Sequence, residues 1–251
     1  MKKVFLFAIS ALMLAGCQKD SSEQTFAGEG KIAITASVSG EVTTRADGIT
    51  LTTPALADFS LKITGTNFSK SWDSLSDYRS DDERYTAGWY TVAINYGDSS
   101  KEGYNLPCFA ASESVQVLDR NRTTKVAMTA KLANAIVEIK TTEAFRNYFP
   151  TYNFKLTTAT NEFELEENQD EHLFIAAQKG VKIDCTCIRQ SNVAEGKTET
   201  LATQTISTVA PATRYIITYD LTSVGGVTVK VTLNETVLGT IEIEKELNPN
   251  A

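Results

Sequence analysis

Cys17 carries the most definite chemistry in this sequence, because its thiol stands at the end of a secretory signal. Two lysines precede an apolar run from Val4 to Leu14, which ends in Leu14-Ala15-Gly16-Cys17. A positive start, a short apolar segment and small residues before the cut describe a signal peptide. A cysteine directly after Ala-Gly predicts the lipoprotein variant, in which Cys17 is acylated and becomes the mature N-terminus.

The signal has consequences for membrane attachment. A retained transmembrane helix is the weaker reading of the apolar run, because about 20 residues are needed to cross a bilayer core of about 30 Å. Several acyl chains on one residue anchor a protein stably. We therefore expect a lipoprotein signal peptide at residues 1–17 and a flexible, polar tether at residues 18–30.

Catalytic constellations are missing from the sequence. His172 is the only histidine, no serine lies in a G-x-S-x-G motif, and there is neither a P-loop nor a G-x-G-x-x-G fingerprint. Glu162, Glu164 and Glu166 would share one face of a strand, which is typical of an exposed polar face rather than of a glycosidase pair. We predict a solvated His172, no catalytic residues, no cofactor and no enzymatic activity.

The remaining cysteines do not predict a disulfide or a metal site. Cys108, Cys185 and Cys187 are odd in number, and two strand residues flanking Thr186 lie too far apart for good disulfide geometry. A C-x-C pair without a second ligand pair is no zinc site. The acids between Asp73 and Glu83 lack the spacing of a calcium loop. Buried free thiols and a solvated acidic loop are expected instead.

Aromatic residues are the most suggestive candidates for ligand binding. They gather in the first half of the chain, where an exposed subset would stack on sugar rings. Trp72 and Trp89 are the candidates for such glycan stacking. The alternative is that these strand aromatics belong to the core.

Composition and charge favour an exported β-protein over a nucleic-acid binder. The whole chain carries a formal charge of −7, and removing residues 1–17 takes away two lysines and no acid. An acidic chain repels phosphate backbones, so no nucleic-acid partner is expected. Threonine is abundant while proline and methionine are scarce, which is a strand composition.

Period-two alternation predicts strands throughout the chain and divides it into two β-sandwiches, at residues 31–131 and 132–251. A short helix is expected in the second, where Thr142 can cap the start and Pro150 ends it. The last two strands form a hairpin. The predicted strands are 31–38, 59–63, 88–96, 114–117, 124–128, 132–139, 152–157, 162–165, 172–175, 181–188, 200–206, 214–219, 227–233 and 237–243.

Several segments together carry a family resemblance. They are Ala87–Val92, Tyr96–Asp98, Phe109–Val117, Thr123–Val126 and Leu132–Ile139, followed by further aromatics up to Tyr152. This combination resembles a domain of unknown function found in fimbrillin-like lipoproteins of Bacteroidota. The resemblance implies two tandem transthyretin-like β-sandwich domains, and a surface lipoprotein that is a structural or adhesive component of fimbriae. A surface glycan-binding lipoprotein is the alternative.

The resemblance also implies a location and a processing step. The stretch after Cys17 resembles the export signal that sends lipoproteins to the outer face of the outer membrane, although it also reads as a solvated linker. Some fimbrillins are trimmed after an arginine, so that a groove accepts a strand from the next subunit. The Arg45-Ala46 bond is the candidate here, and an uncut polar loop is the alternative. The implied partners are the membrane, other fimbrial subunits through donor-strand exchange, and a host or glycan ligand.

Overall fold

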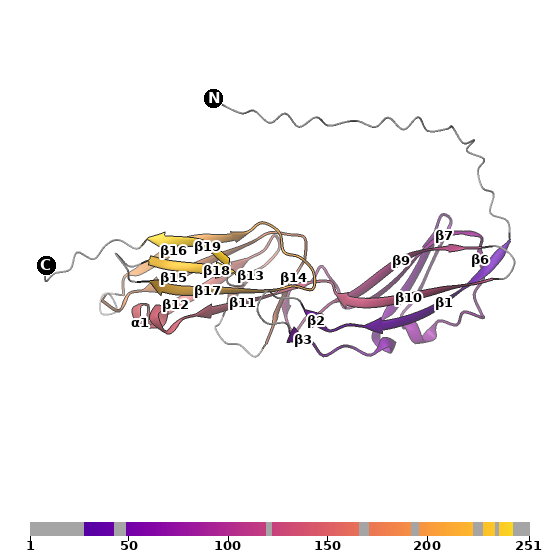
Figure 1. Ribbon diagram of the computed structural model, residues 1–251, viewed down its shortest axis with the longest axis horizontal. Coiled ribbons are helices and arrows are strands. Elements are labelled where there is room, and N and C mark those ends of the chain that lie inside the picture. The colour runs from indigo at the N-terminus through magenta and orange to yellow at the C-terminus, as the bar shows by residue number, and fades with distance from the viewer. Residues whose placement is uncertain are drawn as a thin grey trace, which may run out of the picture.

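The computed structural model describes residues 28–42, 49–118, 122–165, 171–191, 196–222, 228–233 and 236–242. They form an elongated molecule of two β-lobes placed end to end, and β1 (Glu29–Val38) begins at the outer end of the first lobe (Figure 1). Strands predominate, and the one α-helix among these residues is six residues long. The predicted all-β class is confirmed.

The first lobe is built on a seven-stranded sheet with the order β5-β4-β7-β9-β10-β1-β6, beside a β2–β3 hairpin. Every strand predicted up to residue 128 is present, and β9 and β10 are longer than predicted. Short 3-10 helices cover Leu56–Asp58 and Leu75–Asp77. The strands are β1 (Glu29–Val38), β2 (Glu41–Val42), β3 (Ile49–Thr50), β4 (Ser60–Gly65), β5 (Phe68–Trp72), β6 (Tyr85–Thr86), β7 (Gly88–Tyr96), β9 (Phe109–Val117) and β10 (Thr123–Leu132).

Alternation along the strands builds the core of this lobe. In β4, Leu61 and Ile63 are fully buried and lie on either side of the exposed Lys62. Neighbouring strands repeat the pattern, as expected when one face of a sheet is covered. The buried cluster contains Ile32, Val42, Phe59, Leu61, Ile63, Tyr78, Tyr85, Tyr90, Val92, Ile94, Phe109, Val117, Val126, Met128, Ala130, Leu132, Ile136 and Phe174.

The second lobe contains a six-stranded sheet with the order β19-β18-β17-β11-β14-β8 and a four-stranded sheet with the order β13-β12-β15-β16. The predicted terminal hairpin is confirmed by the antiparallel pairing of β18 and β19. The strands are β8 (Gly103–Tyr104), β11 (Ala135–Thr141), β12 (Thr151–Thr157), β13 (Glu162–Leu165), β14 (Leu173–Ile175), β15 (Val181–Ile188), β16 (Thr198–Ile206), β17 (Arg214–Thr222), β18 (Thr228–Leu233) and β19 (Thr236–Glu242).

Helix α1 (Glu143–Tyr148) closes one end of the second lobe's core. Thr142 is its N-cap, and the hydroxyl accepts a hydrogen bond from the Phe145 backbone N–H at 3.3 Å. Phe145 and Phe149 are both fully buried and their ring centroids are 5.0 Å apart. The predicted helix and its cap are therefore confirmed.

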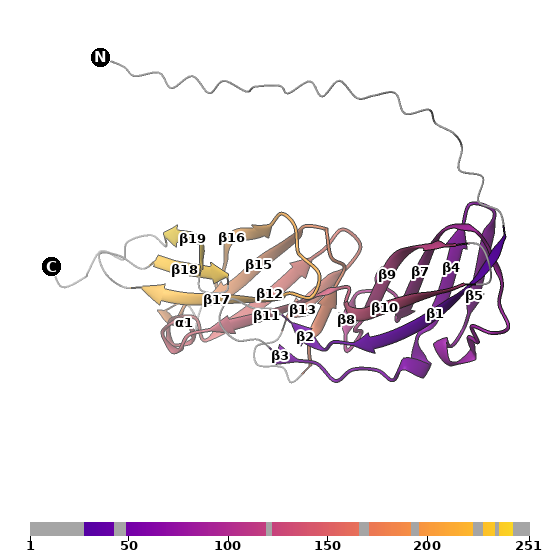
Figure 2. The ribbon, with the colours of Figure 1, turned by 45° about the vertical axis from the view of Figure 1, so that its right-hand side comes forward.

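At the junction, each lobe is held to the other by residues that pack or pair across it. β8 leaves the first lobe to pair with β14 of the second, and Figure 2 shows it at the junction. In return, Ile136 and Phe174 belong to the first lobe's buried cluster. Asn134 is fully buried between the lobes, where its side chain accepts from the Cys108 N–H at 3.3 Å and donates to the Leu106 carbonyl at 2.9 Å.

Glu102, directly before β8, is the main polar link across this junction. Its carboxylate accepts hydrogen bonds from the side chains of Thr158, Thr160 and Asn161, at 2.6, 3.0 and 2.8 Å, and from the Ala176 N–H at 3.0 Å. Burial alone would raise the pKa of Glu102, but these hydrogen bonds outweigh it and hold the pKa below its usual value. The link therefore depends on the ionised carboxylate.

We expect Glu102→Gln to lower the free energy of unfolding by about 1–2 kcal/mol at pH 7, because an amide cannot accept all four bonds. A lowered folded-state pKa contributes stability above the usual value of about 4.3, and that stability is lost as the pH falls through the folded-state pKa. The difference between variant and wild type in urea unfolding should therefore be smaller at pH 3 than at pH 7. Glu113→Gln, at an exposed position of β9, is the control, and an undiminished difference at pH 3 would contradict the assignment.

Candidate functional site

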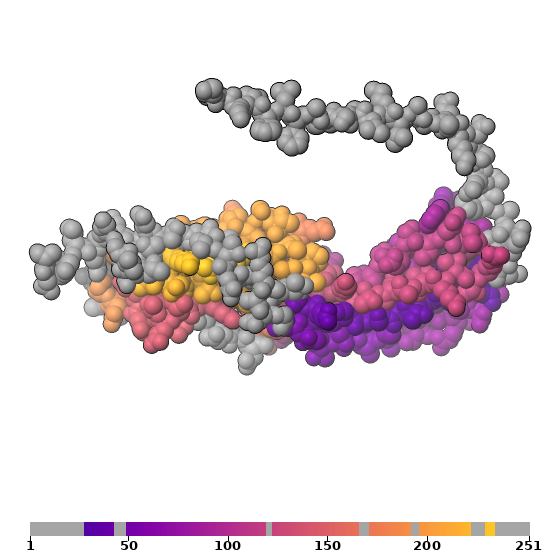
Figure 3. Space-filling view, in the orientation of Figure 1, coloured from indigo at the N-terminus to yellow at the C-terminus, as the bar shows by residue number. Residues whose placement is uncertain are grey.

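β1 has an unusual place in the first lobe. It runs parallel to β10 from the Lys31–Thr123 pair to the Val38–Ala130 pair. On its other side, its pairing within the described ranges is limited to the two residues of β6. Most of β1 is thus an edge strand, and Figure 3 shows its indigo residues along the surface of the first lobe.

The side chains of β1 hold it to the lobe through one face. Ile32 is fully buried, whereas Ile34, Ala36 and Val38 are half-buried against the same cluster. The Tyr78 hydroxyl donates to the Ile32 carbonyl at 2.6 Å, and burial raises the pKa of Tyr78. Backbone pairing, this row of apolar side chains and the Tyr78 hydrogen bond therefore hold β1. The Lys31–Asp81 ion pair at 2.7 Å and the contact between the Ser37 and Thr129 hydroxyls at 2.9 Å add to its attachment.

β10 depends on β1 for its own pairing. Only Lys131 and Leu132, at the end of β10, pair with β9. Without β1, the stretch from Thr123 to Ala130 would keep no backbone pairing with another described strand, although the Thr124 hydroxyl still donates to the Gln116 carbonyl of β9 at 3.1 Å. Unpaired backbone groups are costly when buried and invite a new strand when exposed.

The predicted processing bond follows β1 closely. Arg45 and Ala46 lie outside the described residues, but the segments on either side, β2 and β3, form an antiparallel pair. Gly40, just before β2, lets the backbone pass close to Leu51, because a Cβ at this position would lie 2.1 Å from the Leu51 carbonyl oxygen. A cut between β2 and β3 would separate β1 from the rest of the chain. Cys17 also lies outside the described residues.

The two predicted stacking residues lie on opposite faces of the sheet. Trp72 pairs with Leu61 on the core side, is half-buried, and packs edge-on against Tyr78 with centroids 5.0 Å apart. The Lys70 ammonium lies 5.0 Å from the centre of the Trp72 ring. Trp89, in contrast, is 58% exposed. Only Trp89 therefore presents a largely free ring, and the two do not form one platform.

His172 is not the solvated histidine that the sequence indicated. Its Nδ1 lies 3.1 Å from Glu138 Oε1, and Glu138 also accepts a hydrogen bond from Arg214 Nε at 2.7 Å. His172 is half-buried beside this pair of charged residues. Glu138 and Arg214 lie close together because β11 and β17 are neighbouring strands. Sequence spacing gives no sign of this cluster, since its members lie far apart in the chain.

The predicted free cysteines are confirmed, since Cys108, Cys185 and Cys187 are buried and unpaired. Burial raises the pKa of Cys108. Among the described residues, no group of three or more His, Cys, Asp or Glu side chains could hold a metal ion. No helix in the described ranges is long and apolar enough to span a bilayer.

Two family models match the sequence. The first, a domain of unknown function designated DUF4493, matches residues 28–249. The chain belongs to the DUF4493 family. The second, the prokaryotic membrane lipoprotein lipid attachment site, matches residues 1–18 and includes Cys17. The predicted recognition as a lipoprotein of a domain-of-unknown-function family is confirmed.

Comparison with characterised proteins found no match to this DUF4493 protein. Solved structures with a similar chain course include a candidate cell adhesion protein from Bacteroides eggerthii (11% identity, TM-score 0.41, covering 84% of this chain and 97% of that one). A candidate polysaccharide-binding protein from Bacteroides thetaiotaomicron has 10% identity and a TM-score of 0.40, covering 86% of this chain and 99% of that one.

The fimbrial anchor protein Mfa2 from Porphyromonas gingivalis has 8% identity and a TM-score of 0.39, covering 84% of this chain and 99% of that one. All three TM-scores are below 0.5, so these likenesses assign no function to the DUF4493 protein. A functional argument has to start from its own geometry, above all from β1.

Proposed function

We propose that this DUF4493 protein is a lipid-anchored component of the outer membrane surface that acts as a structural or adhesive subunit of fimbriae. Cleavage of the Arg45-Ala46 bond would release β1 with the lipid, and a strand of another subunit would take its place. The partners are then the membrane before cleavage and neighbouring subunits after it. The role needs no catalysis.

The observation that carries this proposal is the position of β1. It lies at the surface, ends shortly before the predicted cleavage bond, and is the main strand neighbour of β10. Its removal would leave a long groove with backbone groups ready to pair. A matching strand from a second copy of the chain satisfies those groups, as in other cases of strand addition.

The C-terminal hairpin is the candidate donor. β19 is the last strand of its sheet and pairs only with β18. Within residues 237–243, Val237, Ile241 and Ile243 stand at every second position with Gly239 between them, which is close to the alternation of β1. Because β19 is paired on one side only, its transfer to another subunit breaks fewer backbone hydrogen bonds than the transfer of a central strand would.

We also propose that the lobes correspond to two transthyretin-like sandwiches at residues 31–131 and 132–251. Support comes from the two buried clusters, one in each lobe. A repeated pairing adds to it, because β1 runs parallel to β10 in the first lobe, just as β11 runs parallel to β17 in the second.

The test is intact mass and N-terminal sequencing of the protein released from its native cell surface. We expect a mature chain that starts at Ala46, and we expect Arg45→Ala to keep the acylated Cys17. Arg122→Ala is the control, because Arg122 is an exposed arginine away from this bond in the sequence, and it should be trimmed like the wild type. Recovery of acylated Cys17 in assembled fimbriae of the wild type would contradict processing at this bond.

A further inference from the structure

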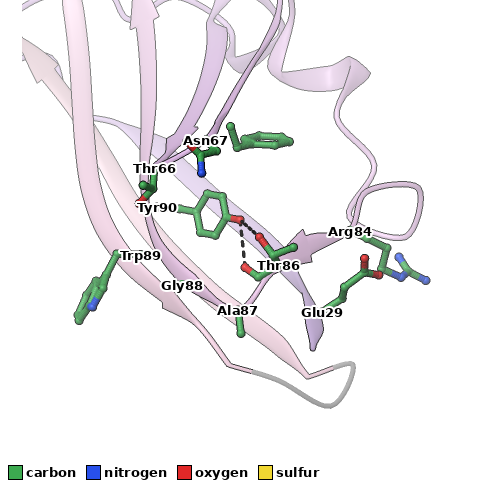
Figure 4. A pocket seen from close by; sticks show the side chains of 10 residues that line it. Glu29, Thr66, Asn67, Arg84, Thr86, Ala87, Gly88, Trp89 and Tyr90 are labelled. Carbon is green, nitrogen blue, oxygen red and sulfur yellow. Dashed lines mark hydrogen bonds between the residues drawn. The ribbon is translucent and has the colours of Figure 1, made fainter. Parts of the chain in front are cut away.

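The outer end of the first lobe contains a hollow that the assembly function does not use. It measures about 440 Å³, within the range of small-molecule sites. The turn between β4 and β5 forms one wall, with Thr66 and Asn67, and the corner between β6 and β7 forms another (Figure 4). Glu29, the first residue of β1, completes it.

The base of the hollow is closely packed and hydrogen-bonded. Tyr90 is only 5% exposed, and its hydroxyl donates to the Thr86 carbonyl at 3.0 Å and lies 3.1 Å from the Thr86 hydroxyl. The Phe68 ring packs edge-on against Tyr90, with centroids 5.8 Å apart. Gly65 allows this packing, because a Cβ there would lie 2.7 Å from the Tyr90 ring. A ligand would therefore meet a preformed surface.

The upper walls offer polar groups that are not used internally. Within the described part of the chain, the side chains of Thr66, Asn67 and Glu29 have no hydrogen-bond partner and are exposed. Arg84 is held nearby through bonds from its guanidinium to the Asp81 and Glu83 carbonyls, at 2.8 and 3.0 Å. One hydroxyl, one amide and one carboxylate supply both donors and acceptors, as the hydroxyl groups of a sugar require.

Trp89 stands at the rim of this hollow. Its side chain is directed away from Tyr90, to the outer face of β7 (Figure 4). There it lies opposite Gln116 of β9, and Thr91 and Ser114 form the next pair along the strands. Lys62 is the only charged residue among the outward-facing positions of β4, β7 and β9. An exposed indole beside uncharged polar groups suits a sugar ring.

We propose that the hollow binds the end of a neutral oligosaccharide, with one unit among Glu29, Thr66 and Asn67 and the next against the Trp89 ring. A neutral ligand fits because Glu29 and Arg84 balance each other in the lining, and because the acidic chain repels anions. The proposal does not rest on strand exchange, since binding takes place on the single untrimmed chain.

The site is complete only while β1 is in place. Glu29 belongs to β1, and β6, which carries Thr86, is paired to β1 through Glu29–Thr86 and Gly30–Tyr85. The Ala87 N–H also donates to the Gly28 carbonyl at 2.9 Å. The anchored, untrimmed chain is therefore the form that binds.

The test uses the untrimmed chain from residue 18 onward and a panel of neutral oligosaccharides ending in hexose, N-acetylhexosamine or deoxyhexose. We expect at least one to bind in isothermal titration, at least tenfold more weakly to Trp89→Ala and severalfold more weakly to Asn67→Ala. Gly88→Gln should abolish binding by filling the hollow, because the nearest atom to a Cβ there is the Thr86 carbonyl oxygen at 3.9 Å.

Leu106→Ala is the matched control, because Leu106 is another exposed large apolar residue, 45% exposed, at the junction of the lobes. It should bind like the wild type, and all variants should keep the wild-type melting temperature. Absence of binding to the whole panel at millimolar concentration would overturn the proposal. Binding that survives both Trp89→Ala and Gly88→Gln would overturn it as well, because the ligand would then lie elsewhere.

Discussion

Ile32→Asp is expected to lower the free energy of unfolding by about 4 kcal/mol, the range found when an unpaired charge is buried. Ile32 is fully buried in the first lobe's cluster, and its carbonyl accepts the Tyr78 hydroxyl hydrogen bond. The aspartate can reach water only if β1 moves away from β10. Urea unfolding followed by circular dichroism measures the loss.

Thr35→Asp is the control for this variant. Thr35 lies in the same strand and has the same pairing to β10, but its side chain is exposed. We expect its effect to stay within about 0.5 kcal/mol, as for most surface substitutions. Equal destabilisation by the two variants would contradict attachment through the buried face of β1.

The Ile32→Asp variant also provides a direct test of strand exchange. A peptide with the wild-type sequence of residues 29–38 should bind to the Ile32→Asp chain, because it fills the groove beside β10 with the side chains that fit there. Binding to the folded form alone raises the apparent stability, by about 2.7 kcal/mol at a hundredfold excess over Kd. A peptide carrying the Ile32→Asp change should not bind. Failure of the wild-type peptide to bind a still-folded variant would contradict an exchangeable β1.

Strand positions were largely predictable from the sequence because they depend on local alternation. β7 and β15 have the predicted bounds, since both carry apolar residues at every second position. β5 was missed because Phe68-Ser-Lys-Ser-Trp72 has an apolar residue only at each end. β6 and β8 have two residues each, which is too short for any period to show.

Strand neighbours could not be predicted in the same way. Alternation indicates which side chains face the core, but not which strand lies alongside, so the parallel pairing of β1 with β10 had no signal in the sequence. The junction was hidden for a similar reason. Glu102 and Asn134 are isolated polar residues, and their partners lie at distant positions in the chain.

The candidate sites also differ in whether they depend on local sequence or on strand pairing. Cys17 and Arg45 are recognised from residues immediately around them, so a sequence is enough to nominate them. Trp72 and Trp89 look alike in the sequence, and only the pairing of Trp72 with Leu61 places its ring on the core side. The hollow beside Trp89 could not be foreseen, because its walls come from β1, the β4–β5 turn and the β6–β7 corner.

In the second lobe, Phe154→Ala is expected to lower the free energy of unfolding by about 4 kcal/mol, since buried phenylalanine truncations cost about 3–5 kcal/mol. Phe154 is 1% exposed, and its ring centroid lies 4.7 Å from that of Tyr219 and 5.6 Å from that of Tyr152. Phe154→Leu keeps most of the volume and should cost less than about 1.5 kcal/mol. Equal losses from both variants would show that cavity formation is not the cause.

The strands that Phe154→Ala destabilises show whether each lobe has its own core. Phe154 belongs to the second buried cluster, and Leu61 and Val92 belong to the first. Local stability follows the contacts of each region, so amide hydrogen exchange in Phe154→Ala should accelerate in β12 and β15 more than in β4 and β7. Equal loss of protection in all four strands would show that the Glu102 and Asn134 links join the two lobes into a single cooperative unit. Release of β1 from the first lobe would then also weaken the C-terminal hairpin that is the candidate donor.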